Sequence, residues 1–171
     1  MNKCVFFDRD GTINIDYGYV HQKENFVFKE NVIEALRILK QKNFLIIVVT
    51  NQSGIARGYY TEEDVISLHD YINQILVSYN VCIDGFYYCP HYIDGIINRY
   101  SKKCICRKPD IGLFIKAQHD YDIDLSNSYM IGDKYSDIEA AKNAKLKKAF
   151  LVKNNNLMQI VSKILLIDEK I

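Results

Sequence analysis

The stretch that decides the fold is CVFFDRDGT, residues 4–12. Its first four residues are apolar and the next, Asp8, is charged, which is typical of a short buried strand that ends at a polar edge. Asp10 follows two residues later, and Gly11 permits a sharp turn directly after it. A second apolar run, FLIIVVT at 44–50, is rich in β-branched residues, as expected of a strand buried on both faces.

The rest of the chain alternates predicted helices and strands. We expect helices near 31–41, 61–79, 110–120, 135–144 and 157–167, and further strands at 85–89, 128–132 and 148–152. Thr61 is a candidate helix cap, and Asn43 a candidate for the left-handed turn that ends a helix. This alternation predicts an α/β fold of three layers, a Rossmann-like parallel sheet with helices on both faces. The length of 171 residues suits one domain.

Composition and charge exclude several classes of function. The formal net charge is +1, so the basic surface of a general nucleic-acid or anionic-membrane binder is not expected. The first apolar run stops at Asp8, too early for a signal peptide, and no run approaches the ~20 apolar residues that span a bilayer. We therefore expect a cytoplasmic protein with reduced cysteines, and nothing in the sequence demands more than a monomer.

Polar residues follow several predicted strands. Asp8 and Asp10 end the first strand, Thr50 ends the second, and Asp133 follows the strand at 128–132. Because the carboxyl ends of parallel strands share one edge, we expect these side chains to converge. Carboxylates bind Mg²⁺, and a carboxylate can also attack phosphorus. A solvated Asp-rich turn is the alternative, and the later motifs TNQSG, RKP and GDKYSD, in that order, disfavour it.

A second group of chemically active residues is rich in sulfur. Cys89 and His91 form one pair, and Cys104 and Cys106 form another, separated by residues 92–103. Three sulfurs and an imidazole in two pairs resemble a structural Cys₃His zinc site. A loop of free thiols and a disulfide are the alternatives, and a reducing compartment disfavours the disulfide.

These motifs together resemble a known family. They are DRDGTIN at 8–14, DYGYV at 16–20, TNQSGIARGYY at 50–60, CPH at 89–91, CICRKP at 104–109 and IGDKYSD at 131–137. The chain is similar to the haloacid-dehalogenase superfamily of aspartate-nucleophile phosphatases, over about residues 1–150. Within it, the chain most resembles the bacterial D-glycero-D-manno-heptose 1,7-bisphosphate 7-phosphatases. The resemblance implies a haloacid-dehalogenase-like sheet with little or no cap, in one phosphatase domain (1–171) that carries a zinc loop (89–106).

The resemblance also implies catalytic roles. Asp8 would attack phosphorus, and Asp10 would protonate the leaving alkoxide and then activate water. Lys108 and Thr50 would donate hydrogen bonds to the phosphate oxygens. The Asp8 carboxylate, the Asp10 backbone carbonyl and the Asp133 carboxylate would hold Mg²⁺.

Further roles are implied for the substrate and for zinc. The implied substrate-binding residues are Asp16, Tyr17, Gly18, Tyr19, Asn51, Gln52, Ser53, Arg57, Arg107 and Lys134. Arg107 is expected to read a second phosphate or a hydroxyl, since its planar fork suits phosphate oxygens. The alternative role for Tyr17 and Tyr19 is packing, and the alternative role for Arg57 is a surface salt bridge. Cys89, His91, Cys104 and Cys106 coincide with the family's zinc loop, so structural zinc would fix where Lys108 points.

The activity that the resemblance implies is Mg²⁺-dependent removal of the C7 phosphate from D-glycero-D-manno-heptose 1,7-bisphosphate, through an aspartyl-phosphate. This step feeds nucleotide-activated heptose for surface polysaccharide such as lipopolysaccharide or capsule. Histidinol-phosphate phosphatase is the nearest alternative. A phosphate-sensing module without turnover and a nucleic-acid end phosphatase are more distant ones, and the near-neutral charge disfavours the last. The chain also has Lys145 where the family usually has glycine, at an expected cost of ~1 kcal/mol.

Overall fold

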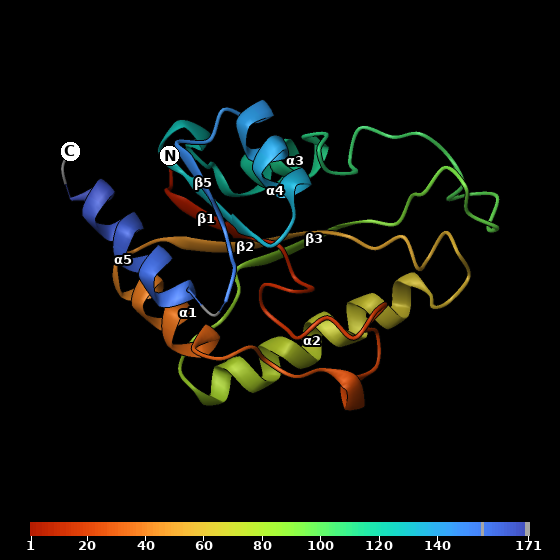
Figure 1. Cartoon of the computed structure of the whole chain (residues 1–171), viewed down its shortest axis with the longest axis horizontal. Coiled ribbons are helices and arrows are strands. Elements are labelled where there is room, and N and C mark those ends of the chain that lie inside the picture. Colours follow the sequence, from red (N-terminus) through yellow and green to blue (C-terminus); the bar gives the residue numbers. More distant parts are fainter. Residues whose placement is uncertain (155, 170–171) are drawn as a thin grey trace.

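The structure is a computed structural model that describes residues 1–154 and 156–169. Its centre is a parallel five-stranded sheet with the order β3-β2-β1-β4-β5 (Figure 1). The strands are β1 (Cys4–Phe7), β2 (Leu45–Asn51), β3 (Gly85–Cys89), β4 (Tyr129–Gly132) and β5 (Lys148–Leu151). β1 is central, and Phe7 lies opposite Val48 of β2 and Ile131 of β4.

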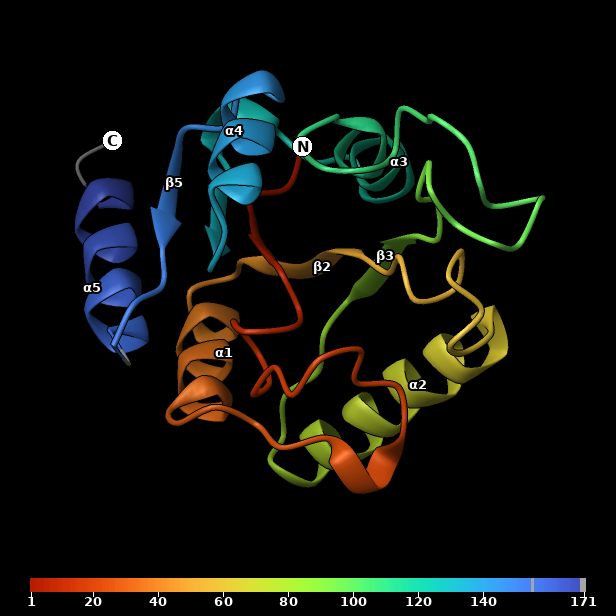
Figure 2. The ribbon, with the colours of Figure 1, turned by 45° about the vertical axis from the view of Figure 1, so that its right-hand side comes forward.

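Helices cover both faces of this sheet. They are α1 (Val32–Gln41), α2 (Glu62–Ser78), α3 (Gly112–Tyr121), α4 (Tyr135–Asn143) and α5 (Leu157–Asp168), with two short 3₁₀ turns, η1 (Lys23–Asn25) and η2 (Leu125–Asn127). Figures 1 and 2 show α1, α2 and α5 on one side and α3 and α4 on the other. The predicted three-layer α/β architecture is therefore confirmed.

The alternation of side chains in β1 explains why the strand reads as a continuous apolar run. Val5 and Phe7 pack in the core on the side of α1, α2 and α5, whereas Cys4 and Phe6 pack on the side of α3 and α4. All four are fully buried, and each large side chain contributes about 1.5–3 kcal/mol on transfer from water. A strand with both faces covered has no solvent face that would need polar residues.

The predicted caps and turns are present where the chain reverses. The Thr61 side chain accepts from the Asp64 amide and the Asp64 carboxylate accepts from the Thr61 amide, so α2 begins with a capping box. Asn43 and Lys145 both adopt left-handed backbone conformations, with φ of 60° and 58°. Lys145 thus keeps the turn that glycine usually makes, at a cost in conformational energy.

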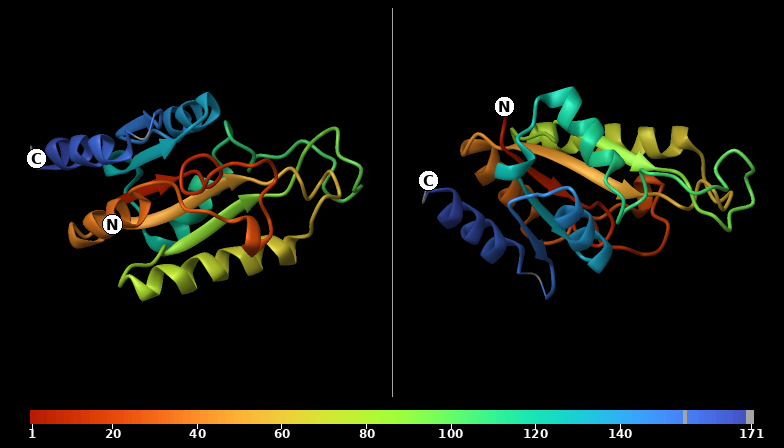
Figure 3. Two further views of the ribbon diagram at one scale, coloured as in Figure 1. Left: turned by 60° about the horizontal axis from the view of Figure 1, so that its bottom comes forward. Right: turned by 90° about the horizontal axis from the view of Figure 1, so that it is seen from above.

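In residues 1–154 and 156–169, loops frame the carboxyl edge of the sheet. Between β1 and α1 the described chain holds only η1, as expected for little or no cap. The segment from β3 to α3 extends beyond the sheet beside the loop after β2 (Figure 3). Two amides of this segment, at Ile96 and Ile97, donate to the Ala56 carbonyl at 2.8 and 3.0 Å.

None of the helices in the described chain combines the length and the apolar character that crossing a membrane requires.

Candidate active site

The carboxylates that follow β1 and β4 meet at one point. Asp8 lies directly after β1, Asp133 directly after β4, and Asp137 in the first turn of α4. One carboxylate oxygen from each lies within 4.8 Å of the other two. The predicted convergence of Asp8 and Asp133 is confirmed, and Asp137 is an addition that sequence reasoning missed. Three carboxylates so close together repel one another unless cations neutralise them.

Lys108 places a buried cation among these carboxylates. Its Nζ lies 2.7 Å from Asp8 Oδ1 and 2.6 Å from Asp137 Oδ1, and it donates to the Val49 carbonyl at 2.7 Å. Burial acts to lower the pKa of Lys108, but Asp8 and Asp137 act to raise it, and the net shift is upward. Lys108 is therefore a fixed ammonium ion at the floor of the site.

Asn51 fixes the backbone of Lys108. Its side-chain amide donates to the Lys108 carbonyl at 3.1 Å, and its Oδ1 accepts from the Lys108 amide at 3.0 Å. This pair of bonds ties the end of β2 to the loop before α3. Asn51 is also a predicted substrate-binding residue, and in the structure its side-chain amide group holds the backbone of Lys108 in place.

Asp133 has the features of a cation ligand. Its Oδ1 is buried without a hydrogen-bond partner among the described residues. Burial, and then the charge of Asp8, raise the pKa of Asp133 from 3.8 to about 6. A Cβ at Gly11 would lie 2.3 Å from Asp133 Oδ2, so glycine is required for this close approach. An unpaired carboxylate oxygen beside a second carboxylate suits Mg²⁺, which prefers oxygen ligands.

Asp137 escaped the sequence analysis although it lies in the IGDKYSD motif. Its Oδ2 accepts from the Lys134 amide at 3.0 Å, so it caps α4 as well as pairing with Lys108. Gly132 leaves room for it, because a Cβ there would lie 2.4 Å from Asp137 Oδ2. An acidic residue in the first turn of a helix is common, so its presence there did not by itself indicate a second role.

Arg9 was missed as well. Its side chain is fully buried, and its guanidinium binds Asp10 through two nitrogens, Nη2 to Oδ2 at 3.0 Å and Nε to Oδ1 at 3.2 Å. It also donates to the Val20 carbonyl at 2.5 Å and to His69 Nε2 at 3.2 Å. Burial, and then the nearby Arg9 cation, hold the pKa of His69 well below its ordinary value, so the imidazole is neutral and accepts.

Gln52 and Tyr60 extend the hydrogen-bond network around the Asp10 carboxylate. Gln52 Nε2 lies 2.9 Å from both Asp10 Oδ2 and Thr50 Oγ1, and Tyr60 donates to Gln52 Oε1 at 2.6 Å. These bonds and the Arg9 pair hold the Asp10 carboxylate in one orientation. The amide of Gln52 is thus engaged within the protein, although the residue was predicted to bind substrate.

Above the carboxylates the structure has a polar cleft of about 360 Å³. Its lining residues are Asp10, Asp16, Gly18, Tyr19, Asn51, Gln52, Ser53, Tyr60, Arg107, Lys108, Lys134 and Ser136. Eight of the predicted substrate-binding residues are in this set. Tyr17 and Arg57 are outside it. The cleft is in the size range of small-molecule sites. Its charged lining side chains are Arg107, Lys108, Lys134, Asp10 and Asp16, and Lys134 Nζ lies 4.0 Å from Asp16 Oδ2. We call the side that Arg107 lines the mouth of the cleft.

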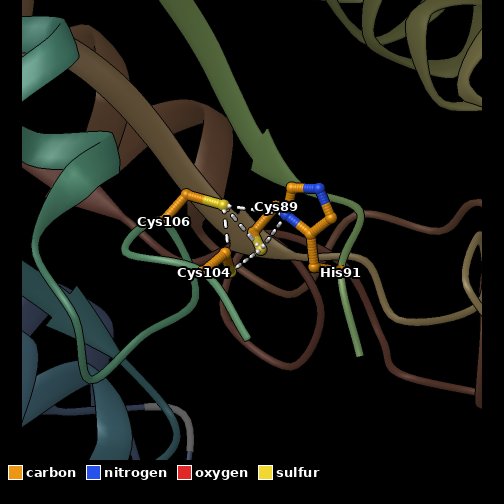
Figure 4. A group of neighbouring side chains, drawn as sticks. All are labelled: Cys89, His91, Cys104 and Cys106. Atoms are coloured by element: carbon orange, nitrogen blue, oxygen red, sulfur yellow. Dashed lines mark hydrogen bonds between the residues drawn. The ribbon is translucent and has the colours of Figure 1, made fainter. Parts of the chain in front are cut away.

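The four predicted zinc ligands come together at the end of β3 (Figure 4). The Sγ atom of Cys106 lies 2.9 Å from that of Cys89 and 3.3 Å from that of Cys104, and His91 Nδ1 lies 3.3 Å from Cys106 Sγ. All three cysteines are free thiols, which argues against the disulfide alternative. Three sulfurs and one imidazole nitrogen within 4.8 Å of one another match the donor set of a closed zinc site.

Known proteins share this architecture. The polynucleotide kinase 3 phosphatase family model matches residues 3–160. A curated D-glycero-beta-D-manno-heptose-1,7-bisphosphate 7-phosphatase from Haemophilus influenzae is 47% identical over 90% of this chain and 83% of its own. A protein with the same name from Escherichia coli (strain K12) is 46% identical over 88% of this chain and 78% of its own.

Two solved structures are similar as well. One, described as a HAD-like phosphatase from Mesorhizobium loti, superposes with a TM-score of 0.86 at 27% identity, over 95% of this chain and 86% of its own. The other is D,D-heptose 1.7-bisphosphate phosphatase from B. bronchiseptica, complexed with magnesium and phosphate, with a TM-score of 0.79 at 28% identity over 94% and 86%. The chain therefore belongs to the polynucleotide kinase 3 phosphatase family and, with its curated relatives, to the heptose-1,7-bisphosphate 7-phosphatases of the haloacid-dehalogenase superfamily.

Proposed function

We propose that this protein is a Mg²⁺-dependent phosphatase that removes the C7 phosphate of D-glycero-D-manno-heptose 1,7-bisphosphate. The observation that carries the proposal is the meeting of Asp8, Lys108 and Asp133 at the floor of a cleft whose mouth holds Arg107. The floor suits the reacting phosphate, and Arg107 suits a second anion. Relatives that carry this activity in their names support the choice of substrate.

In this mechanism Asp8 is the nucleophile. Its carboxylate attacks phosphorus, the bond to the C7 oxygen breaks, and the phosphoryl group is carried on Asp8. Lys108, fixed 2.7 Å from Asp8, and the buried Thr50 hydroxyl donate to the phosphoryl oxygens as negative charge shifts among them. Donors already held in place need no reorganisation during the transfer, and this lowers its barrier.

Asp10 moves the protons in both half-reactions. Its protonated carboxyl donates to the C7 alkoxide as that group leaves, and the resulting carboxylate then takes a proton from the water that hydrolyses the phosphoaspartate. Arg9 and Gln52 hold the Asp10 carboxylate through bonds of 2.9 to 3.2 Å, so it faces the same point in both steps.

The fit of Asp8 and Asp133 to a hard cation supports a catalytic magnesium ion. We infer that the two carboxylates and the Asp10 backbone carbonyl hold it. When bound, magnesium neutralises the carboxylates and lets the nucleophile approach an anionic phosphate. Without it, Lys108 and Lys134 are the cations that act on the three carboxylates.

Magnesium should therefore stabilise the protein more at pH 7 than at pH 5. In the metal-free protein, burial and then the charge of Asp8 raise the pKa of Asp133 from 3.8 to about 6. The ionised carboxylate therefore destabilises the folded state. This cost is absent below about pH 4 and is complete once the pH has risen through 6. Magnesium binds the ionised carboxylate and offsets this cost. In the wild type, we expect the Mg²⁺-induced increase in melting temperature to be larger at pH 7 than at pH 5. In Asp133→Asn, we expect this increase to be nearly the same at the two pH values. An equal increase at both pH values in the wild type would contradict the assignment.

We infer that zinc fills the Cys89, His91, Cys104 and Cys106 cluster and fixes Lys108, which lies two residues after the last ligand. Removing zinc while magnesium stays saturating should lower kcat by about 10-fold or more, as for other groups that support a reacting residue. The measurement pairs metal analysis with steady-state kinetics. Cys104→Ser should reproduce the loss, and Cys82→Ser, outside the cluster, should not. Unchanged turnover in zinc-depleted protein would show that the metal does not support Lys108.

The relatives' names support a place for this reaction in heptose biosynthesis, and we propose that it feeds nucleotide-activated heptose in the cytoplasm. We propose that the protein acts as a monomer.

Steady-state phosphate release tests the substrate. The panel contains both anomers of D-glycero-D-manno-heptose 1,7-bisphosphate, histidinol phosphate and a 3′-phosphorylated oligonucleotide, all with Mg²⁺. We expect a heptose bisphosphate to exceed the others in kcat/KM by about 100-fold or more, because a second charged group then binds at the mouth of the cleft. If histidinol phosphate is preferred, the reaction chemistry stands, and both the substrate and the role of Arg107 are wrong. If the oligonucleotide is preferred, the sugar substrate is wrong.

A further inference from the structure

The ring of Tyr92 lies against two arginine side chains. The guanidinium carbon of Arg57 lies 4.0 Å from the ring centroid, and that of Arg107 lies 5.3 Å from it. Both distances are within the range of cation–π interactions. Arg57 lies in the loop after β2. Tyr92 lies near the start of the segment from β3 to α3, and Arg107 lies near its end. The ring therefore joins two loops at the edge of the cleft.

The two guanidinium groups are not neutralised by the protein. In residues 1–154 and 156–169, no carboxylate forms an ion pair with Arg57 or Arg107. Their contacts with the ring leave the charges at most about 9 Å apart, close to the Debye length in 0.1 M salt. Arg57 Nε is also buried without a hydrogen-bond partner among these residues. Two unpaired cations at this separation repel each other and attract an anion.

Only Arg107 of this trio lines the cleft, where it lies directly before Lys108. Its Nη1 donates to the His91 carbonyl at 3.2 Å, which ties it to the same segment as Tyr92. Tyr92 in turn packs against a small apolar cluster that includes Tyr60 and Tyr100. The cluster thus fixes the ring, and Arg107 contacts both the ring and the cleft.

We propose that Tyr92 is a positioning residue for the second phosphate of the substrate. Its ring holds Arg107 at the mouth of the cleft and keeps Arg57 close to the ring as a second cation. This side of the cleft can then bind the second phosphate of the substrate, a dianion remote from the reacting phosphate. The inference rests on the proposed function. It assigns Tyr92 to the binding of the substrate's far end and gives it no part in the chemistry at Asp8.

The test compares two substrates that share the reacting group. D-glycero-D-manno-heptose 1,7-bisphosphate has the second phosphate, and D-glycero-D-manno-heptose 7-phosphate lacks it. For Tyr92→Leu we expect KM for the bisphosphate to rise about 10-fold with kcat within twofold, because the lost contact orders an arginine and does not touch phosphorus. Kinetics on the 7-phosphate should stay within twofold of the wild type. Tyr92→Phe, which keeps the ring, should restore most of the bisphosphate affinity.

Matched variants separate positioning from a general structural effect. Tyr79→Leu, at an exposed tyrosine after α2, should leave both substrates unchanged. Arg57→Gln should raise KM for the bisphosphate about threefold, since it removes the more distant cation and leaves the ring in place. Arg57→Gln also serves if Tyr92→Leu does not fold. Zinc content and melting temperature are measured for every variant.

The outcomes are distinguishable. If the wild type prefers the bisphosphate and neither Tyr92→Leu nor Arg57→Gln reduces that preference, the inference is wrong and the proposed function stands. Equal losses on both substrates also overturn it, because they mean that Tyr92 only stabilises the loop. If the wild type does not distinguish the two substrates, the proposed function itself fails, and the inference fails with it.

Discussion

Replacing Asp8 by asparagine should abolish turnover, with an expected loss in kcat of at least about 10⁴-fold. Asparagine is nearly the same size, but its amide cannot form the phosphoaspartate, and it removes the anion that Lys108 holds at 2.7 Å. The assay is phosphate release under saturating Mg²⁺ and substrate. Asp70→Asn, at an exposed acid on α2, is the matched control and should keep wild-type activity.

The same variant should remain folded. Asp8 acts to raise the pKa of both Asp133 and Asp137, which means that the three carboxylates repel one another in the metal-free protein. Removing one of them relieves part of this repulsion while Lys108 keeps its contact with Asp137. We expect a melting temperature equal to or above that of the wild type in metal-free buffer. Residual turnover within tenfold of the wild type would show that Asp8 is not the nucleophile.

The second large effect is expected for Lys108→Met. Methionine approximates the apolar stem but leaves three carboxylates without their buried counter-charge, and removing one partner of a buried ion pair typically costs about 3–5 kcal/mol. The free energy of unfolding should fall by about that amount, and kcat/KM by about 10³-fold or more as the phosphoryl oxygens lose their ammonium donor. Lys163→Met, on the exposed side of α5, is the control for both measurements.

The pH dependence of this destabilisation carries a definite sign. Burial and then the charge of Asp8 raise the pKa of Asp137, and without Lys108 that pKa rises further, because the charge that opposed the rise has gone. Carboxylates with raised pKa values cost stability when ionised, and that cost disappears as the pH falls through the folded-state pKa. The difference in melting temperature between wild type and Lys108→Met should therefore be smaller at pH 5 than at pH 7.5 in metal-free buffer. A difference that is constant with pH would mean that lost packing, not charge, destabilises the variant.

The fold could be predicted because its strongest signals are local. The runs at 4–7 and 44–49 are continuously apolar, and the structure buries both faces of β1 and the inner residues of β2. The rule that parallel strands share a carboxyl edge then placed Asp8 and Asp133 together before any contact was known. The zinc ligands could be predicted as well, because three cysteines and a histidine stand in two close pairs along the chain, and the structure brings their ligand atoms within 4.8 Å of one another.

Residues whose role depends on burial were not predicted. Arg9 has the side chain of a surface residue, and only the packing of Val20, Gln52 and His69 around it makes it the partner of Asp10. Asp137 was likewise not predicted, because its contact with Lys108 joins residues 29 positions apart that only the fold brings together.

Loop placement was a further limit. DYGYV predicted a cleft-lining loop, but not that Tyr17 would face solvent while Gly18 and Tyr19 line the cleft. The backbone at Gly18 and Tyr19 has φ of 83° and 53°, and these left-handed conformations set the direction of the loop. Periodicity gives no information about such turns, since it reports only which residues share a face of a helix or strand.

The central claim is that the protein removes one defined phosphate from a sugar bisphosphate. Phosphorus NMR of D-glycero-D-manno-heptose 1,7-bisphosphate with the enzyme and Mg²⁺ tests it directly, since the C1 and C7 phosphates give separate signals. We predict that the C7 signal disappears, inorganic phosphate grows in equal amount, and the C1 signal persists. Loss of the C1 signal, or no reaction while histidinol phosphate is hydrolysed by the same preparation, would contradict the account.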